Sequence, residues 1–206
     1  MKHRLRTAFL TLGLGSGLVL ASAPTAEAWS PTLAQILLAD RVLDDANGFD
    51  RFSLDFDIVT QAVLAFPDLT EAVSNRGSNL TVFLPTDGAF RATYQALTGQ
   101  YISGEKALFD AYVSALGLSA IKEVLTYHLI SGARISYSTA VASDGAQLTT
   151  VNGQTIEVDV TGSWIKRVTL IDKAPTRDPM VIVPNVRAAN GIAHAIDRVL
   201  IPTIVG

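Results

Sequence analysis

No cysteine occurs among the 206 residues of the chain. This absence excludes disulfide scaffolds, thiol nucleophiles, cysteine-ligated zinc sites and a lipid anchor on an amino-terminal cysteine. Basic residues are also scarce, because 16 lysines and arginines stand against 19 acidic residues and give a net charge of -3. The chain therefore has no overall positive field that would attract nucleic acid.

Charged residues make up only 17% of the chain, whereas hydrophobic residues make up 49%. Disordered chains have the opposite composition, so a sizeable buried core is expected. A chain of this length is expected to form one domain. After residue 28 there is no hydrophobic run of membrane-spanning length, and no transmembrane segment is expected there.

The amino terminus is typical of a secretory signal. Three basic residues among the first six precede an apolar stretch over residues 8–23, which is short for a membrane span of about 20 residues. The triplet AEA at residues 26–28 has small residues where signal peptidase needs them, so cleavage before Trp29 is predicted. No twin-arginine pair occurs, which favours the general secretory route and an extracellular or periplasmic protein. The remaining chain has 13 basic and 18 acidic residues, a net charge of -5.

Apolar residues at helical spacing fill most of the first half of the chain. Helices are expected over residues 33–43, 58–66, 104–115 and 119–126, with a further helix that begins after Thr86. Thr86 is expected to cap that helix, and Asp87 is expected to favour its positive end. Residues 80–85, LTVFLP, are typical of one buried strand.

From Tyr127 onward the chain is strand-like. Short apolar runs cover residues 127–130, 133–138, 146–151, 154–160, 166–171, 180–186 and 192–201. Asn152-Gly153 and Asn190-Gly191 between them are signals for tight hairpins. Helices in the first half and strands in the second predict an α+β domain, in which the early strand pairs with the later ones.

Residues 44–57 form an acidic segment between the first two helices. Six of its residues have side-chain oxygen atoms that could bind calcium in a loop: Asp44, Asp45, Asn47, Asp50, Asp55 and Asp57. Their spacing does not match the twelve-residue calcium loop, and no glutamate closes it. A solvated, helix-capping segment is the favoured interpretation.

Three separated blocks resemble the fasciclin domain family. They are TVFLPTDGAF at residues 81–90, the pair Tyr127-His128, and NGIAHAIDRVLIP at residues 190–202. Their order and spacing also match the family, and so does the intervening hairpin VNGQTIEV. The resemblance extends over nearly all of the chain after the signal.

This resemblance implies a secreted or surface-attached adhesion module, built as a β-wedge with helices packed around it. It implies no catalytic activity and no cofactor or metal, and the partner would be a cell-surface or matrix protein. The predicted division is a signal peptide at 1–28, an N-terminal extension at 29–41 and a fasciclin-like domain at 42–204.

Tyr127 and His128 are candidate interaction residues, because in animal members of the family this region is linked to integrin-dependent adhesion. One interpretation exposes both rings to a partner. The other packs both rings inward, with the imidazole bonded to a neighbour such as Thr86 or Asp87. A histidine in an apolar strand without metal-ligand spacing favours the structural role.

Three further polar residues of the last block are candidates: His194, Asp197 and Arg198. His194 alternates with Ile192 and Ile196, so it is expected to be buried or half-buried with a hydrogen-bond partner. Asp197 and Arg198 are adjacent and would point to opposite faces of a strand, so each would need another partner. A polar network that specifies the fold is favoured over a binding site.

Two other functions stay open. A polysaccharide-binding matrix or biofilm component would use exposed aromatic residues, for which the candidates are Tyr94, Tyr101, Tyr112, Tyr137 and Trp164. A hydrolase is the third interpretation, although the chain after the signal has no GxSxG, HExxH or phosphate-loop motif. The sequon at Asn79 matters only if the host glycosylates secreted chains.

Overall fold

The computed structural model describes residues 30–40, 48–50 and 52–203, so the predicted signal peptide lies outside the described residues. The helices are α2 (Leu33–Asp40), α3 (Asp57–Leu64), α4 (Pro67–Ser74), α5 (Asp87–Thr98), α6 (Glu105–Tyr127) and α7 (Tyr137–Val141). The strands are β1 (Leu80–Pro85), β2 (Leu129–Ser131), β3 (Gln147–Thr149), β4 (Thr155–Thr161), β5 (Arg167–Ile171), β6 (Val181–Ala188) and β7 (Gly191–Ile196). The α+β class is confirmed, with helices mainly in the first half.

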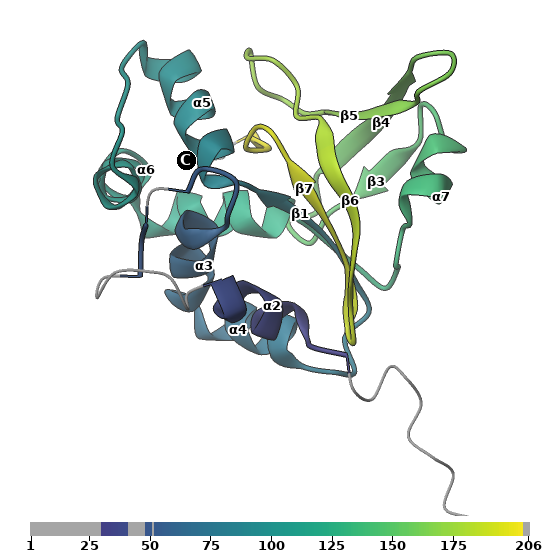
Figure 1. Ribbon diagram of the computed structural model, residues 1–206, viewed down its shortest axis with the longest axis horizontal. Coiled ribbons are helices and arrows are strands. Elements are labelled where there is room, and N and C mark those ends of the chain that lie inside the picture. The colour runs from purple at the N-terminus through teal and green to yellow at the C-terminus, as the bar shows by residue number, and fades with distance from the viewer. Residues whose placement is uncertain (1–29, 41–47, 51, 204–206) are drawn as a thin grey trace, which may run out of the picture.

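Two sheets organise the fold. The larger has the order β2-β1-β7-β6, and the smaller has the order β3-β4-β5. Strand β1 pairs in parallel with β7, from Leu80 opposite Gly191 to Pro85 opposite Ile196, so the expected pairing of the early strand with a late one is confirmed. In Figure 1, helices α2 to α6 lie on one side of the larger sheet, and the smaller sheet and α7 lie on the other.

Strand β1 is buried along its whole length because both of its faces are covered. Its alternate side chains Leu80, Val82 and Leu84 pack with the helices in one core cluster. Phe83 points the other way and packs with Ile156 and other residues of the smaller sheet in a second cluster. The larger sheet therefore separates two cores.

Helix α2 contributes to the first of these cores. Leu33 and Leu37 are buried in the same cluster as α3 and β1. Asn190, in the turn between β6 and β7, is fully buried, accepts a hydrogen bond from the Leu33 N–H at 2.9 Å and donates one to the Val73 carbonyl at 2.7 Å. Helix α2, in the described part of the predicted extension, therefore packs against the domain.

Two local expectations differ from the structure. Residues 133–138 were expected to form a strand, but Ser136 caps the short helix α7 by accepting a hydrogen bond from the Thr139 N–H. The expected helices 104–115 and 119–126 are both present and join as α6, with a break at Gly117, whose φ of 73° is non-helical. Within the described parts of the chain, no helix has both the length and the apolar character needed to cross a membrane.

Candidate functional site

Tyr127 and His128 lie where α6 ends and β2 begins, and both side chains are buried. The Tyr127 hydroxyl donates a hydrogen bond to the Thr155 carbonyl at 2.9 Å. His128 Nδ1 lies 2.7 Å from the Val124 carbonyl oxygen, and Nε2 accepts a hydrogen bond from the Leu200 N–H at 3.0 Å. These two partners fix a neutral ring with its proton on Nδ1.

Burial changes the titration of both rings. It lowers the pKa of His128 to about 4, because the charged imidazolium would lose its hydration. It raises the pKa of Tyr127 to about 12 for the corresponding reason. Neither Thr86 nor Asp87 bonds to His128, so the predicted partner of the imidazole was wrong. The ring reaches backbone groups that the sequence pattern did not single out.

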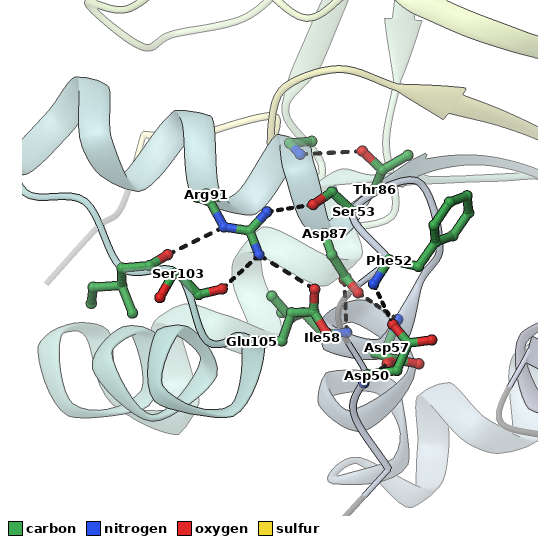
Figure 2. Close-up of polar contacts among 12 residues, drawn as sticks. Asp50, Phe52, Ser53, Asp57, Ile58, Thr86, Asp87, Arg91, Ser103 and Glu105 are labelled. Carbon is green, nitrogen blue, oxygen red and sulfur yellow. Dashed lines mark hydrogen bonds and ion pairs between the residues drawn. The ribbon is translucent and has the colours of Figure 1, made fainter. Parts of the chain in front are cut away.

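Thr86 and Asp87 have separate structural roles. The Thr86 hydroxyl accepts a hydrogen bond from the Ala89 N–H at 3.2 Å and caps α5, as expected. Asp87 instead accepts hydrogen bonds from the Asp57 N–H at 3.2 Å and the Ile58 N–H at 3.0 Å (Figure 2). Asp87 lies in the first turn of α5, as predicted, and its carboxyl group also caps the amino-terminal end of α3.

Asp87 is fully buried, and this burial is the main reason why its pKa rises, to about 9. A side-chain hydrogen bond with Asp55 and the negative charge of that residue raise the pKa further. The hydrogen bond from the Ile58 N–H acts in the opposite direction but does not outweigh burial. At neutral pH the Asp87 carboxyl group therefore holds a proton.

Arg91 on α5 neutralises part of this acidic region. Its guanidinium group donates to Ser53 Oγ at 2.7 Å, to the Ile102 carbonyl at 3.2 Å and to the Ser103 carbonyl at 3.0 Å (Figure 2). It also forms an ion pair with Glu105 at 3.3 Å. Burial raises the pKa of Glu105, while Arg91 acts to lower it.

Asp55 and Asp57 in the acidic segment are not solvated as predicted, because they are only 7% and 1% exposed. Asp44, Asp45 and Asn47 lie outside the described residues. Two sets of carboxylates, one of Asp50, Asp57 and Glu105 and one of Asp55, Asp87 and Glu105, have oxygen atoms within 4.8 Å of one another. Carboxylate oxygens at such separations are the ligand type that calcium prefers. Here the proton on Asp87 and the arginine described above offset much of the negative charge.

An open depression of about 750 Å³ lies beside this cluster. It is lined by Phe49, Asp50, Ser53, Arg91, Tyr101, Ser103, Gly104, Glu105, Lys106, Ala107 and Asp110. Tyr101 is 64% exposed and presents an aromatic ring beside charged groups of both signs. The sequence indicated Tyr101 only as one of several loop aromatics.

His194 is buried in β7, and each ring nitrogen meets a backbone group. Nε2 lies 2.9 Å from the Ile135 carbonyl oxygen, and Nδ1 accepts a hydrogen bond from the Asn185 N–H at 3.3 Å. Burial lowers the pKa of His194, so the ring stays neutral at pH 7.

Asp197 lies in a bend just beyond β7, so the expectation that it continues a strand was wrong. Its carboxylate accepts a hydrogen bond from the Met180 N–H at 2.8 Å and forms an ion pair with Arg177. It also lies 3.9 Å from the Arg198 guanidinium, a pairing that a strand geometry would have prevented. Asp197 thus joins the segments on either side of β6 and β7.

An apolar cavity of about 170 Å³ lies among α3, α5 and α6. Leu97 and Leu116 in its lining are partly exposed, at 48% and 38%. Neither the composition nor the apolar periodicity of the sequence indicated this cavity.

The loop between β4 and β5 carries the most exposed apolar side chains of the described residues. Trp164 is 99% exposed and Ile165 is 76% exposed. The loop is held at its base, because the Tyr137 hydroxyl donates a hydrogen bond to the Lys166 carbonyl at 2.9 Å. Gly162, with a φ of 90°, approaches so closely that a Cβ there would lie 2.1 Å from the Ile165 carbonyl oxygen. We call residues 162–166 the β4–β5 tip.

Comparisons with known proteins agree with this fold. "Protein sll1483" of Synechocystis is 29% identical over 161 residues, which cover 78% of this chain and 73% of that protein. A second protein from Synechocystis, the uncharacterized protein sll1735, is 26% identical over 172 residues, which cover 83% and 98% of the two chains.

A similar solved structure is a FAS1 domain pair from the insect cell adhesion molecule Fasciclin I, with a TM-score of 0.56 and 20% identity. The match covers 85% of this chain but only 51% of that chain, so this protein spans about half of the pair. The fasciclin domain family itself matches over residues 55–202, which include both signature blocks and the central tyrosine-histidine pair. The chain therefore belongs to the fasciclin domain family.

Proposed function

We propose that the protein is a secreted, non-catalytic adhesion module that binds a cell-surface or matrix protein. Family membership and the likeness to a domain pair from an adhesion molecule support this function. The observation that carries the proposal is the exposure of Trp164 and Ile165 at the β4–β5 tip. Tryptophan is enriched among the residues that dominate the binding energy of protein interfaces.

The geometry of the β4–β5 tip suits a preformed contact. The hydrogen bond from Tyr137 and the tight approach at Gly162 restrict the loop before any partner arrives. A restricted loop loses less conformational entropy when it binds. Trp164 and Ile165 would therefore form the apolar centre of the contact, and the exposed Lys166 and Arg167 would lie at its rim.

Attachment measurements test this proposal. Beads coated with residues 29–206 should attach to the surface of host cells, and Trp164→Ala combined with Ile165→Ala should remove most of the attachment. Both side chains are exposed, so the melting temperature of the double variant should stay close to that of the original protein. Leu118→Ala is the matched control, because Leu118 is also an exposed apolar residue. Full attachment of the double variant would contradict the role of the tip.

The adhesion function itself needs a separate test. Host cells that lack residues 29–206 should attach less to surfaces and retain less matrix. Unchanged attachment and unchanged matrix content would overturn the proposal as a whole. If the tip double variant restores attachment to these cells, the contact with the partner lies elsewhere on the domain.

We propose that Tyr127 and His128 support adhesion through the fold and do not touch the partner. Both side chains are buried and bonded to backbone groups of other elements. Substitution of either residue should therefore lower stability and attachment together. Loss of attachment without any change in melting temperature would contradict this role.

A hydrolase of the Ser-His-Asp type would need a histidine that is free to move a proton. Among the described residues, His128 and His194 each have both ring nitrogens engaged by backbone groups. Their lowered pKa values reflect burial and not a neighbouring acid. These contacts support a non-catalytic function.

Polysaccharide binding is the second candidate function, and the depression around Tyr101 favours it. An exposed aromatic ring beside carboxylates and amines can stack on a sugar and bond to its hydroxyl groups. A glycan array should then give signals that Tyr101→Ala removes and that the tip double variant keeps. If no glycan gives a signal above background, polysaccharide binding is contradicted and protein binding stays as the proposed function.

A further inference from the structure

We propose that the cavity among α3, α5 and α6 binds a compact, uncharged hydrocarbon group about the size of one six-membered ring. Its volume is about 170 Å³. An engineered protein cavity of about 150 Å³ with apolar walls stays dry and takes up benzene. The volume therefore sets the size of the ligand group, and the walls set its chemistry.

The walls come from separate parts of the chain. Ala62 lies on α3, Leu97 on α5 and Val199 in the segment after β7. Helix α6 contributes both of its halves, with Val113 before the break at Gly117 and Val124 after it. Residues on both sides of the break at Gly117 therefore line the same cavity.

Aromatic contacts keep one wall in place. The Tyr112 hydroxyl donates a hydrogen bond to the Phe90 carbonyl at 2.8 Å. The Tyr112 ring lies edge-on to Phe90 at 5.6 Å and to Tyr94 at 5.4 Å. These rings are fixed against one another, so they do not collapse into the free volume.

The polar side-chain atoms of Thr93, His128 and Tyr112 in the wall are already used. The Thr93 hydroxyl accepts a hydrogen bond from the Val199 N–H at 3.0 Å, and both nitrogens of His128 bind backbone groups. The Tyr112 hydroxyl is likewise engaged by its own backbone partner. A polar ligand would lose its hydration without finding partners, so an uncharged hydrocarbon is the class that fits.

The cavity has a route to solvent. Leu97 and Leu116 line it and are 48% and 38% exposed, which places them at its mouth. The ligand can therefore be a free small hydrocarbon or the apolar end of a longer molecule whose polar part stays outside. Both sources present the same group to the walls.

Titration of purified residues 29–206 with toluene and, separately, with decanoate tests the proposal and distinguishes its two sources. Toluene should raise the melting temperature in a saturable way and shift the methyl resonances of Leu97, Leu116 and Val124. If a longer molecule is the natural source, decanoate should bind more tightly than toluene at the same methyl groups. If a free hydrocarbon is the source, decanoate should bind more weakly.

Two variants fill the cavity from different walls. Ala62→Leu and Val113→Phe should each weaken toluene binding at least about tenfold, because the added carbons occupy the volume of the ligand. Val151→Phe is the control, since it adds the same ring at an exposed hairpin position. Binding that survives both substitutions, or methyl shifts away from these walls, would overturn the proposal. If one filled variant fails to fold, the other and the resonance map of the unsubstituted protein still decide it.

Discussion

The imidazole of His128 accepts a hydrogen bond from the backbone N–H of Leu200 at 3.0 Å, although 72 positions separate the two residues. This bond ties the end of α6 to the segment that follows β7. Both groups are buried, so neither has water as an alternative partner. An unsatisfied buried donor costs about 1–3 kcal/mol.

We predict that His128→Ala lowers the free energy of unfolding by about 3–5 kcal/mol, because it leaves the Leu200 N–H unpaired and opens a cavity. Tyr127→Phe is the milder comparison, since it removes only the hydrogen bond to Thr155 and should cost about 1 kcal/mol. Urea denaturation measures both effects. Equal losses for the two variants would contradict the importance of the bond to Leu200.

The pH dependence of stability should report the buried imidazole. The pKa of the His128 imidazole is about 4 in the folded protein, whereas its ordinary value, taken for the unfolded chain, is 6.5. Between these two pH values the unfolded chain therefore binds more protons than the folded protein. Stability contributed by neutral His128 is complete above pH 6.5 and is lost as the pH falls toward 4. Proton NMR titration should show its ring resonances unchanged down to about pH 5, whereas a midpoint near 6.5 would contradict the burial of the ring.

Asp87 should act in the opposite direction at higher pH. Its folded-state pKa is about 9 and its ordinary value is 3.8, so the folded protein holds a proton that the unfolded chain releases. Stability from this group is complete below pH 3.8 and decreases as the pH rises toward 9, by up to about 1.4 kcal/mol per pH unit. Between pH 6.5 and 9 this decrease is free of the His128 effect.

Denaturation midpoints at pH 6.5 and pH 9 check this. Asp87→Asn should flatten the decrease, because an amide does not titrate. Equal slopes for the variant and the original protein would contradict a protonated Asp87.

Asn190 should be among the most sensitive polar positions. Its side chain bonds to the Leu33 N–H and the Val73 carbonyl, and so joins the β6–β7 turn to α2 and α4. Asn190→Ala should lower the free energy of unfolding by about 2–4 kcal/mol, since two buried groups lose their partners. Hydrogen exchange of the Leu33 amide should also become faster. Slow exchange at Leu33 in the variant would show that another group replaces the asparagine.

Glycine substitutions can separate backbone strain from steric clash. Gly99→Ala should cost about 1 kcal/mol, because the residue has a φ of 72° but nothing lies within 4 Å of the added Cβ. Gly162→Ala should cost more, because its Cβ would lie 2.1 Å from the Ile165 carbonyl oxygen. It should also change the fluorescence of Trp164, while Gly99→Ala should not. Equal effects on stability would contradict the tight packing of the β4–β5 tip.

Local patterns predicted much of the fold. The apolar run of β1 predicted a strand covered on both faces, and Thr86 predicted the start of α5. The turn signals at Asn152-Gly153 and Asn190-Gly191 placed two hairpins correctly. These features depend on neighbours in the chain, which the sequence contains directly.

The errors concern contacts between distant segments. The roles of Asp87 at the start of α3 and of His128 beside Leu200 depend on how elements pack, which residue type alone does not determine. The helix at 137–141 was missed because its capping residue, Ser136, lies within an apolar run that is typical of a strand. The sequence contained one indication of the cavity beside α6, which was the glycine between two expected helices. This glycine could be linked to a cavity only after the packing of α3 and α5 against α6 was known.

The parallel pairing of β1 with β7 has a consequence for the order in which the chain can fold. Strand β1 receives its second neighbour only when residues 191–196 are available, near the end of the described chain. A chain that emerges from its amino terminus therefore leaves one hydrogen-bonding edge of β1 unpaired until residues 191–196 have emerged. Contacts between such distant segments slow folding and favour binding by chaperones in the meantime. The pairing of β1 with β7 thus makes completion of the larger sheet a late step in folding.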